Sequence, residues 1–155
     1  MRRCAPHSYW ISLQVSLGVI RSRRSRLVQV KGPGKWRLDL GKEFHVIDNG
    51  DSIQAVAGDR VVHLSAMQIS SGTGVPTGAE VRATASRSLR SSERMSHRGH
   101  AVEGEAEIRR DAESLSLHGF MCASGGLATC VISFNAPEDA AWAESVWRSL
   151  NYAVA

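Results

Sequence analysis

The segment SLSLHGFMCASGGLATCVISFNAPEDAAWAESVWRSLNY, residues 114–152, decides the fold. Its first part alternates apolar with small or polar residues, and residues 127–134 are rich in β-branched and aromatic residues. Both patterns are typical of strands. Gly125 and Gly126 lie between them and supply the positive φ angles of a two-residue type I′ turn. We therefore expect a β-hairpin.

A turn at Gly125-Gly126 also predicts which residues face one another. On the face that we expect to be buried, the pairs are Met121–Cys130, Gly119–Ile132 and Leu117–Phe134. Cys122 pairs with Thr129 and points to the opposite face from Cys130. A disulfide between Cys122 and Cys130 is therefore not expected.

An amphipathic helix follows the hairpin. Asn135 is a favoured N-cap, Pro137 suits the first turn, and Glu138 can bond back to Asn135. Steps of about 100° per residue place apolar side chains on one arc, namely Trp142, Ala143, Val146, Trp147 and Leu150. We interpret Trp142 and Trp147 as core residues at the margins of this arc. The alternative is that this tryptophan pair lines a binding groove for a partner.

Composition indicates one globular domain, and the charge is unevenly distributed. The 155 residues are 43% apolar and 22% charged, which is ordinary for such a domain. Residues 1–37 hold nine Arg or Lys and no acid, whereas residues 38–155 hold ten basic and fifteen acidic residues. The pI of 9.3 therefore reflects the N-terminal segment and does not indicate a basic domain.

Residues 1–31 are interpreted as a poorly ordered basic extension that precedes a single domain, residues 32–155, with the boundary at the breaker Gly32-Pro33-Gly34. Alternatives for the extension are a targeting segment, a strand over residues 11–19, or an artefact of the start site. Arg23 and Arg24 are its candidate contacts with nucleic acid or an anionic surface. Because no recognition fold adjoins them, a solvated tail is favoured and nucleic acid is not the expected partner.

The domain begins with a strand at residues 36–40 and continues as a meander. Asn49-Gly50 is a strong type I′ hairpin signal, and Gly58-Asp59 marks a second turn. The predicted strands are residues 43–47, 52–57 and 60–69. This arrangement places His45, Gln54 and His63 side by side on one sheet face.

These histidines are the candidate metal ligands. If His118 shares the face of His45 and His63, three imidazoles are enough for a zinc or other transition-metal site. No HExxH spacing or carboxylate supports this hypothesis, and polar residues are normal on a solvated antiparallel face. No cofactor is expected, because no cofactor-binding motif is present.

A second helix and an acidic strand lie in the middle of the chain. The capping box Thr77-Gly78-Ala79-Glu80 predicts a helix that ends near Ser92. Its apolar positions are Val81, Ala85 and Leu89, and its arginines are expected on a solvated outer surface. Glu103, Glu105 and Glu107 recur at period two, so we expect them on one exposed face of a later strand.

The cysteines and the hydropathy bear on the compartment. Cys4, Cys122 and Cys130 form no CxxC and no metal-ligand spacing. No apolar run reaches the length of a membrane span. A reducing, cytoplasmic setting is the expectation.

The order of these elements, with Pro33-Gly34-Lys35-Trp36 at the start and Ser149-Leu150 at the end, resembles the Mog1/PsbP-like domains. The resemblance covers residues 33–152 as a pattern of elements. It implies an α+β fold, in which two helices pack on an antiparallel β-sheet of about six strands as an α/β/α sandwich. It transfers no functional residue, but it implies protein binding rather than catalysis.

The expected function is therefore that of a non-catalytic protein-interaction domain, such as a bacterial accessory or immunity-type protein. The partner itself is unknown. The alternatives are a small-molecule or metal-binding domain that uses the histidine-bearing face, or nucleic-acid contact through the basic extension.

Overall fold

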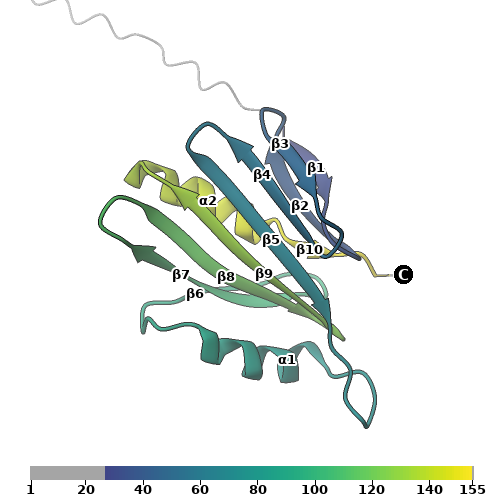
Figure 1. Cartoon of the computed structure of the whole chain (residues 1–155). Coiled ribbons are helices and arrows are strands. Elements are labelled where there is room, and N and C mark those ends of the chain that lie inside the picture. The colour runs from purple at the N-terminus through teal and green to yellow at the C-terminus, as the bar shows by residue number, and fades with distance from the viewer. Residues whose placement is uncertain (1–26, 155) are drawn as a thin grey trace, which may run out of the picture.

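A computed structural model describes residues 27–154. The fold is built on one seven-stranded sheet in which every pair of neighbours is antiparallel (Figure 1). In spatial order its strands are β3 (His45–Asp48), β4 (Ser52–Ala57), β5 (Arg60–Gln68), β9 (Gly126–Phe134), β8 (Leu115–Ala123), β7 (Glu103–Arg110) and β6 (Met95–Arg98). The main sheet therefore exceeds the six strands expected.

A second, three-stranded sheet was not predicted. It consists of β1 (Leu27–Lys31), β2 (Trp36–Gly41) and β10 (Asn151–Tyr152), with β2 in the middle. Residues 27–31 were assigned to the extension, but they form a strand because each pairs with a residue of β2. Gly32-Pro33-Gly34 thus lies in the turn between two paired strands. Arg23 and Arg24 lie outside the described residues.

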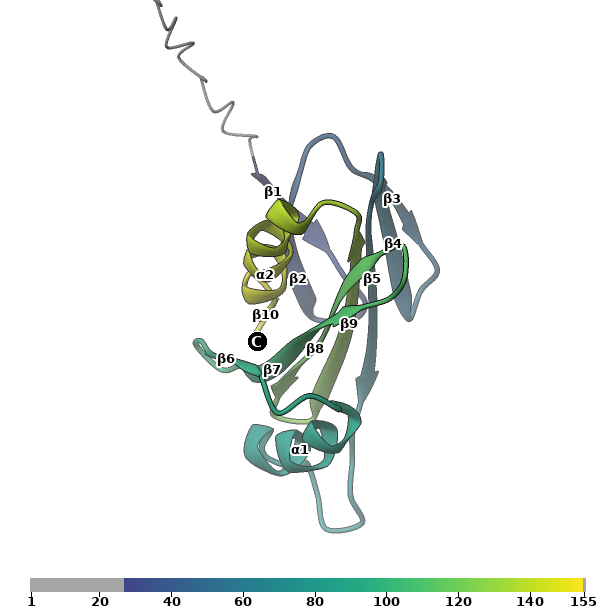
Figure 2. The same cartoon turned by 90° about the vertical axis from the view of Figure 1, so that its left-hand side faces the viewer.

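The two α-helices pack on opposite faces of the main sheet, as the α/β/α arrangement predicts. The helix α2 (Ala140–Arg148) and β2 cover one face (Figure 2). The helix α1 (Gly78–Ala85) packs on the other face near β7 and β8, through a separate cluster around Phe120 and Cys122. Among residues 27–154, no helix is long and apolar enough to cross a membrane.

Trp147 is at the centre of the larger core. Its indole is fully buried, and its Nε1 donates a hydrogen bond to the Phe120 carbonyl oxygen at 3.3 Å. Gly119 makes this position possible, since a Cβ there would lie 2.7 Å from Nε1 and 2.9 Å from Cδ1 of the indole. The alternating β2 side chains Trp36, Leu38 and Leu40 are buried in the same core.

The closing hairpin has a different register from the predicted one. The turn is Ser124-Gly125, because Ala123 pairs with Gly126, Met121 with Ala128 and Gly119 with Cys130. Of the two turn residues only Gly125 has a positive φ, at 68°, so the type I′ prediction is wrong. Gly126 instead continues β9, where a Cβ would lie 3.1 Å from the Tyr152 ring.

A register shift of two residues leaves every side chain on its predicted face. Cys122 accordingly packs in the α1 cluster and Cys130 in the larger core, which confirms that they point to opposite sides. Both are free thiols. Burial raises the pKa of each to about 12, so both stay protonated near neutral pH.

The first hairpin is also shifted by two residues. Asp48 pairs with Ile53, so residues 49–52 form the loop. The Asp48 carboxylate accepts a hydrogen bond from the Gly50 N–H at 2.8 Å, and the Asn49 N–H donates to the Ser52 carbonyl at 2.9 Å. These bonds favour a wider turn over the two-residue turn that Asn-Gly predicts.

The helix starts were predicted with mixed success. Thr77 and Glu80 form the predicted capping box of α1, which continues as a 3₁₀ turn at Ser86–Ser88 and stops short of Ser92. The predicted N-cap at Asn135 is wrong. A 3₁₀ turn, Pro137–Asp139, precedes α2. The N-cap of this 3₁₀ turn is Ala136, which makes no side-chain hydrogen bond.

Candidate functional site

One face of the main sheet is largely free of helix. Over β4, β5 and β9 the face opposite α2 is turned toward the viewer in Figure 1, and α1 lies only along one end of the sheet. Its aliphatic side chains are Ile47, Val56, Val61, Met67 and Val131, and its polar side chains are Gln54, His63, Ser65, Thr129 and Ser133. We call these ten residues the open sheet face. Ile47 is 43% exposed and Met67 is 54% exposed.

The three candidate histidines lie on this side of the sheet, but not together. Gln54 pairs with His63 as predicted, whereas His45 pairs with Val56, which corrects the expected row of His45, Gln54 and His63. His63 and His118 flank Val131 on strands two apart, so their backbones are separated by about 10 Å.

The geometry gives the metal hypothesis no support. His63 Nε2 lies 3.2 Å from Ser65 Oγ, and His118 Nε2 lies 3.0 Å from Ser116 Oγ, so each imidazole is engaged on its own strand. Within the part of the chain that the structure describes, no group of three or more His, Cys, Asp or Glu is placed to hold a metal ion.

Ser116, His118 and Glu107 invite comparison with a catalytic triad. Glu107 on β7 pairs across from His118 on β8. However, a triad needs its acid hydrogen-bonded to the histidine. Here the Glu107 carboxylate accepts hydrogen bonds from Arg109 and from the N–H groups of Arg90 and Ser91. Burial and the nearby Arg109 lower the pKa of His118, so its imidazole is neutral at pH 7.

The tryptophan pair does not line a common groove. Trp147 is a core residue, as predicted, but it lies at the centre of the core and not at the margin expected for it. Trp142 is half-buried and stacks on Phe44 with 5.8 Å between ring centroids. The Arg60 guanidinium lies 4.7 Å from the centroid of the Trp142 ring and pairs with Asp139 at 2.6 Å. Trp142 therefore closes the margin of the core, as the sequence predicts.

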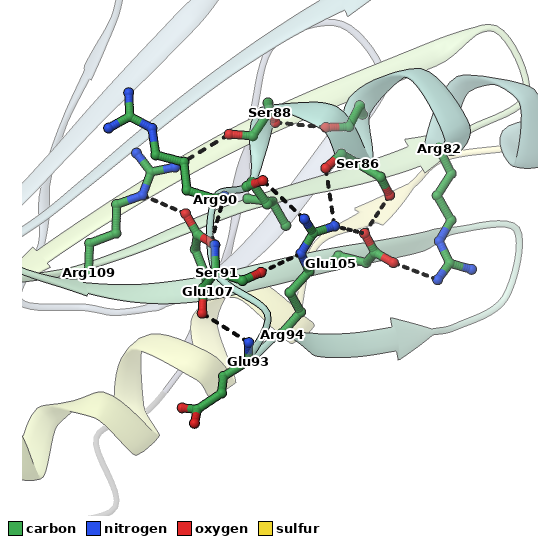
Figure 3. A network of polar contacts seen from close by, with 12 residues as sticks. Arg82, Ser86, Ser88, Arg90, Ser91, Glu93, Arg94, Glu105, Glu107 and Arg109 are labelled. Carbon is green, nitrogen blue, oxygen red and sulfur yellow. Dashed lines mark hydrogen bonds and ion pairs between the residues drawn. The ribbon is translucent and has the colours of Figure 1, made fainter.

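The glutamate row on β7 is paired with arginines, and Glu107 is buried while Glu103 and Glu105 are half-buried, whereas an exposed strand face was predicted (Figure 3). Arg82 bonds Glu103 at 3.2 Å and Glu105 at 2.8 Å, and Arg109 bonds Glu107 at 2.6 Å. Glu107 is 1% exposed. Two of the arginines expected on a solvated surface, Arg82 on α1 and Arg94 in the following loop, thus hold these segments against the sheet.

These contacts determine how the carboxylates titrate. Burial alone would raise the pKa of Glu107, but hydrogen bonds from the Ser91 N–H, Arg109 and the Arg90 N–H outweigh it, so the pKa lies below the ordinary value. Burial likewise opposes the bonds from Ser86 and Arg82 to Glu105, and the pKa is again lowered. Both groups are therefore ionised when folded at neutral pH.

We expect acid to weaken the fold through this network. Each lowered pKa contributes stability that is present above the unfolded-state value of 4.5 and lost as the pH falls through the folded-state value. Urea unfolding followed by circular dichroism measures the free energy of unfolding at each pH. Between neutral and acid pH this free energy should fall less in the double variant Glu105→Gln/Glu107→Gln than in the wild type. An equal fall in the free energy of unfolding in the two proteins would contradict this assignment.

No protein-family model matches the chain, and no curated protein matches it. Solved structures do match. The solution structure of cyanobacterial PsbP (CyanoP) from Synechocystis sp. PCC 6803 has a TM-score of 0.54 and 13% identity, over 83% of this chain and 94% of that one.

A crystal structure from Bacteroides thetaiotaomicron VPI-5482 has a TM-score of 0.59 and 10% identity, over 81% of this chain. This chain spans about half of the length of that protein, 48%. Identities this low establish the fold alone. The structural similarity, together with the antiparallel sheet and the helix on each of its faces, shows that the chain has a Mog1/PsbP-like α+β fold.

Proposed function

We propose that the chain is a non-catalytic protein-interaction domain that binds its partner through the open sheet face. The observation that carries this proposal is the set of five apolar side chains, Ile47, Val56, Val61, Met67 and Val131, on the part of this face that α1 leaves open. Ile47 and Met67 are exposed and the three valines are half-buried, with polar side chains between them. Mixed apolar and polar surfaces of this kind are typical of non-obligate interfaces.

Charge at the β8 end of this face indicates the chemistry of the partner. Burial, Arg109 and Arg90 lower the pKa of His118 against the opposing effects of Glu107 and Asp111, so both arginines lie near this end of the face. Arg90 is exposed, and none of the described carboxylates forms an ion pair with its guanidinium. The strands of the open sheet face contribute no carboxylate to its ten residues. A partner with an aliphatic surface bordered by carboxylates would complement this face.

Site-specific photo-crosslinking in a lysate of the source cells tests the proposal. A photoreactive residue at Thr129, which is exposed on the open sheet face, should capture one protein that the same residue at Ser145, exposed on α2, does not. Val131→Glu, which introduces a charge into the aliphatic patch, should abolish the capture without unfolding the domain. Equal capture from Thr129 and Ser145, or capture that Val131→Glu leaves intact, would reject this surface.

The charge argument has its own matched pair of variants. Once the partner is identified, Arg90→Glu should weaken binding by about tenfold and reduce its dependence on salt. Arg110→Glu is the control, since Arg110 is exposed but pairs with Leu115, whose row lies on the opposite face. The same affinity for both variants would show that carboxylates of the partner do not meet Arg90.

A further inference from the structure

A cavity of about 690 Å³ opens at one end of the main sheet. Five segments of the chain that are distant in sequence line it. These are Lys35, the first residues of α1, the β6–β7 hairpin, the end of β8, and the residues Tyr152 and Val154. The volume falls within the range of about 300–1,000 Å³ that is usual for small-molecule sites.

Part of the cavity lining is apolar and uncharged. Val102 is 5% exposed and Ala123 is 1% exposed, and the Tyr152 ring forms another wall. Cys122 is also a lining residue, and burial raises the pKa of its thiol to about 12, so it carries no charge at neutral pH. This surface suits the hydrocarbon part of a ligand.

The charged groups at the cavity leave an excess of positive charge. Lys35 Nζ lies 5.9 Å from the centroid of the Tyr152 ring, and no carboxylate among residues 27–154 forms an ion pair with it. The lining carboxylate, Glu103, is bonded by Arg82 at 3.2 Å and by Arg98 at 3.3 Å. Arg82 bonds Glu105 as well, at 2.8 Å, so it compensates only part of the charge of Glu103, and Lys35 is the excess cation.

Arg98 can exchange its exposed ion pair for a bond to a ligand. Its side chain is 80% exposed, so its pair with Glu103 is screened by water and adds little stability. The guanidinium can turn toward an anion in the cavity without leaving Glu103 unpaired, because Arg82 remains in place. A planar guanidinium is well suited to bind a carboxylate or sulfonate through two parallel hydrogen bonds.

The lip of the cavity holds a strained residue. Ala101, in the β6–β7 turn, has a φ of 61° and is the one non-glycine residue with a positive φ in the described part of the chain. This conformation is costly for alanine. Such strain is concentrated at ligand and active sites, where the surrounding structure imposes it.

We propose that this cavity binds a small organic anion that has an apolar body. Arg98 and Lys35 bind its acidic group, and Val102 and Tyr152 contact its hydrocarbon part. The site is separate from the open sheet face, because none of the ten residues of that face lines it. The proposal of anion binding in the cavity and the proposal of protein binding by the open sheet face are therefore tested independently.

Fluorescence titration of the full chain with 8-anilinonaphthalene-1-sulfonate tests the site, since this probe combines a sulfonate with aromatic rings and brightens in apolar surroundings. We expect saturable one-to-one binding that Lys35→Met/Arg98→Met weakens at least about tenfold. Ala79→Trp, which places a bulky side chain at an exposed lining position, should weaken it similarly.

The controls are Lys42→Met/Arg110→Met, two exposed cations outside the cavity, which should bind the probe as the wild type does. Thermal unfolding checks that each variant is folded. Arg98→Lys keeps the charge but loses the two parallel hydrogen bonds, so it should bind the probe more weakly than the wild type and more tightly than Lys35→Met/Arg98→Met. Absence of saturable binding to the wild type would overturn the proposal. So would wild-type affinity in either Lys35→Met/Arg98→Met or Ala79→Trp.

Discussion

Replacing Trp147 with alanine should destabilise the domain by about 3–5 kcal/mol, the usual cost of removing a large aromatic side chain from a core. The indole is fully buried between α2 and the sheet, so the loss combines apolar burial with an unfilled cavity. The Phe120 carbonyl also loses the hydrogen bond from Nε1. Urea unfolding followed by far-UV circular dichroism measures the change without relying on tryptophan fluorescence.

Trp142→Ala is the matched control in the same helix. Trp142 is half-buried, so its removal should cost less, about 1–2 kcal/mol. Equal losses for the two variants would contradict the assignment of Trp147 to the centre of the core.

A double-mutant cycle separates packing from helix effects. Gly119→Ala should destabilise the wild type by about 1–3 kcal/mol, because its Cβ would lie 2.7 Å from the indole Nε1. In the Trp147→Ala background the same change should cost less, since the indole is absent and only the 2.9 Å approach to Ala106 Cβ remains. Additive effects would show that Gly119 is required for another reason.

Replacing Glu107 with alanine should cost about 3 kcal/mol, as expected when one partner of a buried hydrogen-bonded charge pair is removed. Glu107 is 1% exposed, and its carboxylate is the acceptor for Arg109 and for the N–H groups of Arg90 and Ser91. The two N–H groups account for most of the loss, because Arg109 is 30% exposed and can be solvated. Urea unfolding measures the total.

Hydrogen exchange locates the effect. In Glu107→Ala the amides of Arg90 and Ser91 should exchange faster than in the wild type. The amides of the central strands β5 and β9 should remain protected, and their exchange should be limited by the lower free energy of global unfolding. Glu113→Ala, at an exposed position, should change the unfolding free energy by less than about 0.5 kcal/mol. Unchanged protection at Arg90 and Ser91 would show that Glu107 does not hold this loop.

Much of the fold was predictable because it depends on local chemistry. The capping box at Thr77 and Glu80 and the alternation in β2 each use interactions within a few residues. The faces of Cys122 and Cys130 were also predictable, since a register error of two residues preserves side-chain orientation. Both errors of register arose at turns. In the first hairpin the Asp48 carboxylate bonds the Gly50 N–H. In the closing hairpin Gly126 lies in β9 beside Tyr152, where a Cβ would come within 3.1 Å of the ring, so this glycine answers a packing need rather than a turn.

The candidate sites were less predictable, because they depend on which strands become neighbours. Period-two glutamates on residues 103–107 and arginines on residues 82–94 were visible in the sequence. Their opposite charges were a signal that glutamates and arginines could pair. Which of them do pair depends on the packing of α1 beside β7, which the sequence does not show. The sequence carried no signal for the cavity at Lys35 and Arg98, since its walls come from five separate segments of the chain.

By itself, the sequence determined the α+β class, the antiparallel hairpins, the amphipathic faces and the burial of Trp147, since each follows from periodicity and turn chemistry over short distances. The tertiary structure alone decided the second sheet, the pairing of the glutamate row, the separation of the three histidines and the cavity. These features arise from contacts between residues far apart in the chain, and such contacts are selected by the free energy of the whole packed core rather than by any local pattern.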